Sequence, residues 1–123
     1  MISRLLAASL VFLTMMTGEP ALAQSSSPYD GTWSIMVVTE RGDCGQAARY
    51  SLQIFNSQLF VATIGVFISG QVTRKGAVTV SVMRGSDLAN GTGKLNGETG
   101  KGRWIGRSQT GECRGYWVAE KRV

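Results

Sequence analysis

Gly91-Thr92-Gly93-Lys94-Leu95-Asn96-Gly97 is echoed by Gly100-Lys101-Gly102-Arg103-Trp104-Ile105-Gly106, so the chain contains two successive segments of the form Gly-x-Gly-basic-apolar. Neither segment has the spacing of a dinucleotide-binding motif or a P-loop, and no helical pattern follows them. Glycine inside a strand marks strong coiling or close packing of a neighbouring strand. The repeat therefore predicts two glycine-rich β-strands rather than a phosphate-binding loop.

A third segment of strand type, Cys113 to Glu120, follows the repeat and contains another tryptophan. If a hairpin joins it to the second glycine-rich segment, each tryptophan covers a glycine on the opposite strand, which stabilises glycine positions in sheets. The expected pairs are Trp104 with Gly115 and Trp117 with Gly102. On this register the polar side chains point outward, because lysine and arginine are rarely buried without a partner. The outward residues are Lys101, Arg103, Arg114 and Tyr116.

Apolar residues also alternate with polar ones in the preceding part of the chain, most clearly at Val78, Val80 and Val82. Turn residues such as Asn56-Ser57 separate the runs. Eight short segments of this type predict an all-β fold, either an antiparallel barrel or a sandwich. If the first and last strands pair, the meander closes into a small eight-stranded barrel or a flattened barrel without exposed edges.

The two cysteines, Cys44 and Cys113, lie just after the first expected strand and at the start of the last one. An even pair in a short exported chain is most simply one disulfide. Two thiols in a chain without histidine make a poor zinc site, since a structural zinc ion takes four ligands of these types. We therefore expect a bridge between Cys44 and Cys113, which would place the first and last strands side by side.

Residues 1–23 have the features of an export signal, namely a positive start, an apolar run over residues 5–16 and small residues before Ala23. The apolar run is shorter than the roughly 20 residues that a permanent membrane anchor needs. We expect cleavage after Ala23, a lead-in without structure over residues 24–28 and a single barrel domain over residues 29–123. The mature protein, without an anchor, is expected in the periplasm or outside the cell.

The two ends of the expected mature chain resemble segments of known proteins. Tyr29-Asp30-Gly31-Thr32-Trp33, together with the ending Cys113-Arg114-Gly115-Tyr116-Trp117-Val118-Ala119-Glu120-Lys121, resembles a group of small exported bacterial proteins of uncharacterised function. Gly31-Thr32-Trp33 with Lys121 or Arg122 also resembles the end-sealing signature of the calycin superfamily of lipocalins, avidins and bacterial protease inhibitors. That resemblance implies a barrel in which a cation lies over an indole face. The expected strands of six or seven residues, however, predict a barrel shallower than that of a ligand-enclosing lipocalin.

Catalytic chemistry is not indicated. The commonest general base, histidine, does not occur in the chain, and the cysteines are assigned to a bridge. The carboxylates fall mostly in expected turns, and their spacing proposes no acid pair of the glycosidase type. These residues are Asp30, Asp43, Asp87, Glu98 and Glu112. We therefore expect a binding protein without catalytic residues, metal ion or cofactor.

A formal net charge of +5 indicates attraction to anionic surfaces or polymers but names no ligand. Four basic residues are expected to share the outer face of the last three strands: Lys94, Lys101, Arg103 and Arg114. This face predicts binding of an anionic glycan or lipid of the cell envelope, and the alternative is a solvated face that keeps the protein soluble. Nucleic acid is not an expected partner, because no row of aromatic residues accompanies the charges.

The stretch from Phe55 to Phe67 supports a second function, because its run over residues 59–64 is apolar on both faces and its inward side is undetermined. Some of its phenylalanines, Phe55, Phe60 and Phe67, are expected to be exposed. An exposed apolar patch usually marks a partner surface. The stretch therefore predicts protein binding, such as inhibition of an envelope hydrolase. The alternatives are a small core beneath a loop, or self-association.

Overall fold

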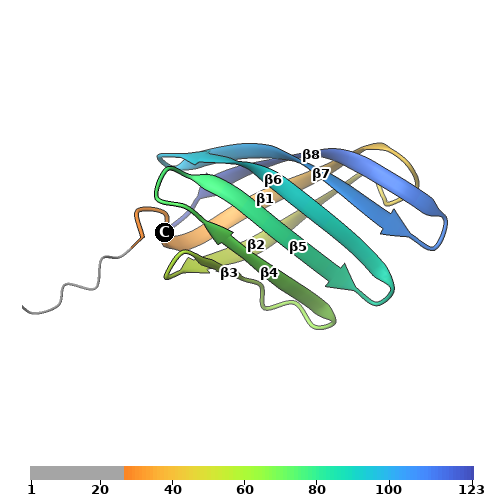
Figure 1. Ribbon diagram of the computed structural model, residues 1–123, viewed down its shortest axis with the longest axis horizontal. Coiled ribbons are helices and arrows are strands. Elements are labelled where there is room, and N and C mark those ends of the chain that lie inside the picture. The colour runs from red at the N-terminus through yellow and green to blue at the C-terminus, as the bar shows by residue number, and fades with distance from the viewer. Residues whose placement is uncertain (1–26) are drawn as a thin grey trace, which may run out of the picture.

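The computed structural model describes residues 27–123 and shows eight antiparallel β-strands that close into a barrel (Figure 1). In chain order the strands are β1 (Gly31–Arg41), β2 (Ala47–Phe55), β3 (Gln58–Phe60), β4 (Val66–Val72), β5 (Ala77–Arg84), β6 (Asp87–Asn96), β7 (Thr99–Ser108) and β8 (Gly111–Lys121). Each strand pairs with the next, and β1 pairs with β8. The predicted eight-stranded meander barrel with one disulfide is confirmed.

The expected signal peptide, residues 1–23, lies outside the described residues, as do the first three residues of the expected lead-in. The last two residues of that lead-in belong to a turn, in which the Asp30 N–H donates to the Ser27 carbonyl at 3.1 Å. Within residues 27–123 no helix is long and apolar enough to cross a bilayer.

Six of the eight strands are longer than the six or seven residues expected from alternation. The longest, β1 and β8, have 11 residues each, and β6 and β7 have 10 each. Alternation hides this length because inward positions of β6 and β7 are often glycine, while outward positions include apolar residues such as Ile105 and Val118. The expectation of a shallow barrel is therefore wrong.

The wall of the barrel is least paired at β3. The expected run over residues 59–64 forms a strand only as far as Phe60, and its inward residue is the buried Leu59. The pairing of β3 with β4 consists of Gln58 opposite Gln71. Residues 61–65 then leave the sheet and lead to β4.

One end of the barrel is sealed by the residues around Trp33. The Trp33 side chain is fully buried, and its indole N–H donates to the Tyr29 carbonyl at 2.9 Å. The Asp30 carboxylate accepts hydrogen bonds from the backbone N–H groups of Asn56 (2.9 Å) and Ser57 (3.2 Å). Asn56 and Ser57 form the tight turn between β2 and β3, so the chain before β1 is fastened across this end.

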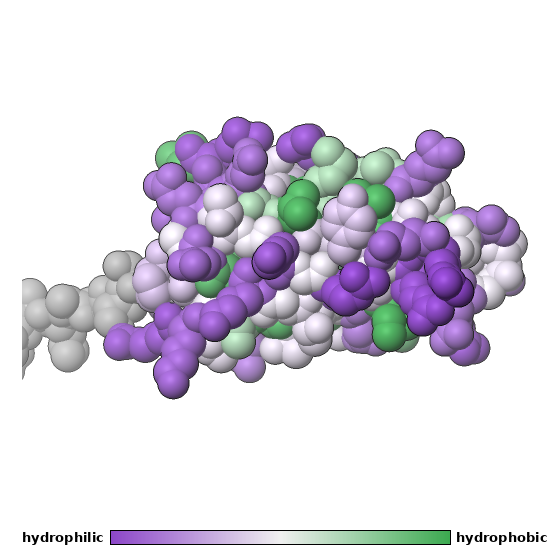
Figure 2. All heavy atoms as spheres, turned by 90° about the horizontal axis from the view of Figure 1, so that it is seen from above, coloured by the Kyte–Doolittle hydropathy of each residue, from purple (hydrophilic) through white to green (hydrophobic). Residues whose placement is uncertain are grey.

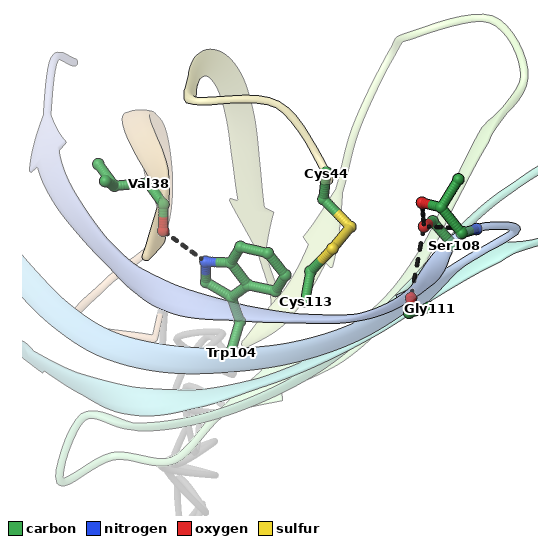
Figure 3. Close-up of a disulfide and its surroundings, with 7 residues drawn as sticks. Val38, Cys44, Trp104, Ser108, Gly111 and Cys113 are labelled. Atoms are coloured by element: carbon green, nitrogen blue, oxygen red, sulfur yellow. Dashed lines mark hydrogen bonds between the residues drawn. A yellow bond between two sulfur atoms is a disulfide. The ribbon is translucent and has the colours of Figure 1, made fainter. Parts of the chain in front are cut away.

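The predicted bridge between Cys44 and Cys113 is present, with a Cα–Cα distance of 6.0 Å. It joins the loop between β1 and β2 to β8 at the end of the barrel opposite Trp33. Figure 3 shows the bridge beside the Trp104 indole, whose N–H donates to the Val38 carbonyl at 3.1 Å. A disulfide of this kind is compatible with an exported protein.

The predicted register of the two tryptophans is also confirmed: Trp104 lies opposite Gly115, and Trp117 lies opposite Gly102. The Trp117 indole reaches over four inward glycines on β6 and β7, namely Gly91, Gly93, Gly100 and Gly102. A Cβ atom at Gly93 or Gly102 would overlap with the ring. The glycine repeat therefore makes room for one indole.

Candidate ligand-binding cavity

The interior of the barrel is not filled by its own side chains. It contains a cavity of about 860 Å³ lined by apolar residues from all eight strands, with the three tryptophans, Trp33, Trp104 and Trp117, as the largest. Pockets for small-molecule ligands commonly measure about 300 to 1,000 Å³. The cavity is therefore large enough to hold a small molecule.

The burial of inward side chains shows where this cavity opens. Those nearer Trp33 are buried: Leu52, Ile54, Leu59, Val72, Val78 and Leu95. Those farther along the same strands are only half-buried: Ile35, Val37, Ile68, Val80, Val82 and Ala89. Because both groups face inward, solvent reaches the second group through the end opposite Trp33. The right-hand end of Figure 1 is this open end.

Residues from three connections, most of them polar, surround the opening. They come from the β1–β2 loop (Asp43 and Cys44), the β5–β6 turn (residues 84–87) and the β7–β8 turn (residues 107–110). One ion pair lies beside the opening, with Arg107 Nη2 3.9 Å from Glu112 Oε1. The site thus combines an apolar interior with a polar mouth.

The indole N–H groups of the interior are already paired. All three indole N–H groups donate to backbone carbonyls: Trp33 to Tyr29, Trp104 to Val38 and Trp117 to Thr92. Within residues 27–123 no residue in the buried set is polar or charged, and no buried side-chain nitrogen or oxygen lacks a partner. A polar ligand group enclosed there would lose its hydrogen bonds to water, which is costly. The part of a ligand enclosed among the buried residues is therefore expected to be apolar, while the half-buried Tyr50, which also lines the cavity, offers a hydroxyl group to a ligand.

Sequence reasoning missed the cavity, although a signal for it was present. An eight-stranded barrel has an interior that side chains can just fill. On β5 and β6 the inward cross-strand pairs are small, with Val78 opposite Gly93, Val80 opposite Gly91 and Val82 opposite Ala89. The volume of these side chains, rather than their alternation, indicates unfilled space.

The four predicted anion-binding residues all lie on the outer face, but they do not form one free group. Lys94 and Lys101 lie directly opposite each other on β6 and β7. Arg103 is engaged, because its Nη2 atom lies 2.8 Å from Glu40 Oε1. Arg114 lies opposite Arg41 in the β1–β8 pair, beside a register shift that follows Thr39. The uncompensated charge is therefore divided into a lysine pair and an arginine pair.

Figure 2 views the molecule from above, over the face formed by β6, β7 and β8. Hydrophilic side chains are spread over this face among residues of intermediate hydropathy, and a few hydrophobic residues lie between them. Among residues 27–123, no carboxylate lies within 4.0 Å of the charged groups of Lys94, Lys101, Arg41 or Arg114. This outer face can thus attract anions, and it also exposes the apolar residues Ile105 and Val118 beside the charged ones.

The prediction that some phenylalanines are exposed is confirmed: the exposed fractions are 67% for Phe55, 47% for Phe60 and 72% for Phe67. They do not lie at one place. Phe55 ends β2 beside the sealed end, whereas Phe67 lies near the start of β4 at the open end. A protein-binding role for the three residues together stays a prediction.

Within the described part of the chain, no group of three histidine, cysteine, aspartate or glutamate side chains could hold a metal ion. The structural features that can hold a ligand are thus the apolar cavity and the basic outer face. A scan of protein-family models and searches of curated proteins and of solved structures find no match for this chain.

Proposed function

We propose that this protein is a non-catalytic binding protein that encloses the apolar part of a small molecule in its barrel. The observation that carries the proposal is the cavity of about 860 Å³, whose lining is apolar and which opens at one end. We further propose that the protein works after export, in the periplasm or outside the cell, which its disulfide supports.

The energetics of an unfilled apolar cavity support this role. Atoms that line a void lack van der Waals contacts on one side, and a ligand that fills the void restores them. A ligand that binds only the folded protein also stabilises it in proportion to the logarithm of its concentration. The protein should therefore be more stable when the cavity is occupied.

We also propose that the protein is related to the calycins. Trp33 lies opposite Lys121 in the β1–β8 pair, and Gly31-Thr32-Trp33 opens the first strand at the sealed end. This arrangement supports the resemblance in which a cation at the end of the last strand lies near the indole. The long strands and the cavity support it further, because they supply the depth that enclosure of a ligand requires.

Replacing Val80 by phenylalanine should weaken ligand binding at least about tenfold, because the ring occupies space inside the cavity. The measurement is the fluorescence of N-phenyl-1-naphthylamine, a neutral apolar dye, titrated with purified protein. Quenching of the three cavity tryptophans provides a second readout. The matched control is Thr79→Phe, which adds a ring on the exposed outer face of the same strand. Absence of dye binding by the wild type, or equal binding by Val80→Phe, would contradict the proposal.

A second candidate function is binding of an anionic glycan or glycolipid of the envelope on the outer face. The observation that favours it is the pairing of like charges, with Lys94 opposite Lys101 and Arg114 opposite Arg41. Like charges directly opposite each other in a sheet are destabilising. An anion bound between them relieves this repulsion, and arginine can hold phosphate or carboxylate through two hydrogen bonds.

The double variant Lys101→Gln/Arg114→Gln should bind a purified anionic envelope glycolipid at least about tenfold more weakly than the wild type at low salt, with a shallower salt dependence. Arg49→Gln/Arg74→Gln has the same net charge and serves as the control, because both residues lie outside β6, β7 and β8 and do not line the cavity. Binding would be measured by titration at low and high ionic strength. Equal losses in both variants would indicate a net-charge effect and no site.

A further inference from the structure

Exposed apolar side chains lie side by side on three neighbouring strands at the open end. Phe67 on β4 lies opposite Met83 on β5, and Met83 lies opposite Leu88 on β6. Ile64 lies three residues before Phe67, in the loop that leads to β4. The exposed fractions are 100% for Ile64, 72% for Phe67, 51% for Met83 and 44% for Leu88. We call these four residues the apolar rim.

The apolar rim adjoins the mouth of the cavity. Leu88 itself lines the cavity, and so do Val66 next to Phe67 and Arg84 next to Met83. A surface that covers the rim therefore also covers one side of the opening. A ligand could then pass between that surface and the barrel interior without crossing water.

The charge around the open end is nearly balanced. Five basic and four acidic side chains lie at this end, with Arg103 counted beside its partner Glu40: Arg41, Arg84, Arg103, Arg107, Arg114, Glu40, Asp43, Asp87 and Glu112. Most of the net charge of +5 therefore resides elsewhere, including the lysine pair of β6 and β7. A surface that matches this end is apolar at its contact and has little net charge.

We infer that the apolar rim docks on the surface of a zwitterionic lipid bilayer, from which the cavity takes up its ligand. This inference rests on the proposed function, because a molecule whose enclosed part is apolar concentrates in bilayers rather than in water. Phe67 and Met83 place apolar side chains among the lipid head groups, as interfacial anchors do. Arg84, adjacent to them, keeps its charged end in the polar layer.

The experiment measures flotation of the protein with phosphatidylcholine vesicles. Phe67→Ser/Met83→Ser should lower partitioning onto the vesicles at least about tenfold, since two exposed apolar side chains lose their burial. The matched control is Phe55→Ser/Phe60→Ser, whose side chains have similar exposure (67% and 47%) but lie outside the apolar rim. This control should float like the wild type. Because the charge at the open end is nearly balanced, salt should change wild-type partitioning less than about twofold.

Two further measurements separate this inference from the proposed function. The rim variant should still bind N-phenyl-1-naphthylamine in solution without vesicles, because its cavity is unchanged. Val80→Phe should float normally although it binds the dye poorly. A wild type that does not float, or equal flotation of the rim variant and the wild type, would overturn the inference. Loss of an envelope protein from the rim variant in a pull-down, without vesicle binding by the wild type, would assign the rim to a protein partner instead.

Discussion

Replacing Trp117 by alanine should lower the free energy of unfolding by about 3 to 5 kcal/mol, the range found for large aromatic residues removed from cores. The indole is buried and donates to the Thr92 carbonyl at 3.2 Å. It also covers the inward glycines of β6 and β7, which have no side chains of their own to fill the space. Its loss therefore enlarges a cavity that is already unfilled and exposes the backbone of two strands.

The effect would be measured by urea unfolding of the ligand-free protein. Tyr116→Ala is the matched control, because it removes an aromatic ring from the neighbouring outward position of the same strand and should cost less than about 1 kcal/mol. Trp104→Ala should resemble Trp117→Ala, since Trp104 is buried and covers Gly115 and Gly106. If both alanine variants lowered the free energy of unfolding by less than about 1 kcal/mol, the glycine repeat would not serve to accommodate the two tryptophans.

The order and closure of the strands could be predicted because they depend on local patterns. The tryptophans and glycines of the last hairpin have a register that admits few alternatives, since a shift by one residue would turn every side chain to the other face. The two cysteines added a long-range constraint, because a bridge between Cys44 and Cys113 requires β1 and β8 to be close. These features together predicted a closed barrel.

The cavity could not be predicted in this way, because alternation gives the direction of a side chain and not the volume that it fills. Val80 and Val82 form part of the clearest alternating strand, yet their partners Gly91 and Ala89 are too small to meet side chains from across the barrel. Strand length was underestimated for a related reason. Inward glycines such as Gly93 and outward apolar residues such as Ile105 make the alternation of apolar and polar residues along a strand less clear.

The ion pair between Arg103 and Glu40 also could not be predicted from the sequence pattern. Glu40 lies at a register shift in the β1–β8 pair, between Thr39 and Arg41. Such an irregularity changes the direction of a side chain, and no turn residue marks it in the sequence. Glu40 consequently reaches Arg103 on β7 across the intervening strand, and one of the four predicted anion-binding residues is neutralised.

A second large effect is expected from removal of the disulfide. Cys44→Ala/Cys113→Ala should lower the free energy of unfolding by about 4 kcal/mol, because the bridge closes a loop of 69 positions and restricts the unfolded chain. All of β2 to β7 lie inside this loop. The unfolded variant is consequently more expanded than the unfolded wild type. Urea unfolding should therefore show a steeper dependence on denaturant in the variant, because more surface becomes exposed.

The wild type in the presence of a thiol reductant provides the control for this measurement. It should match the double variant, whereas the double variant should not respond to the reductant. The folded barrel should persist in both at low denaturant, because β1 and β8 are joined by their own ladder from Trp33 to Arg41. The expectation for the disulfide would be contradicted if the double variant lost less than about 1 kcal/mol of unfolding free energy and showed an unchanged dependence on denaturant. That result would mean that the unfolded chain already keeps its first and last strands close without the bridge.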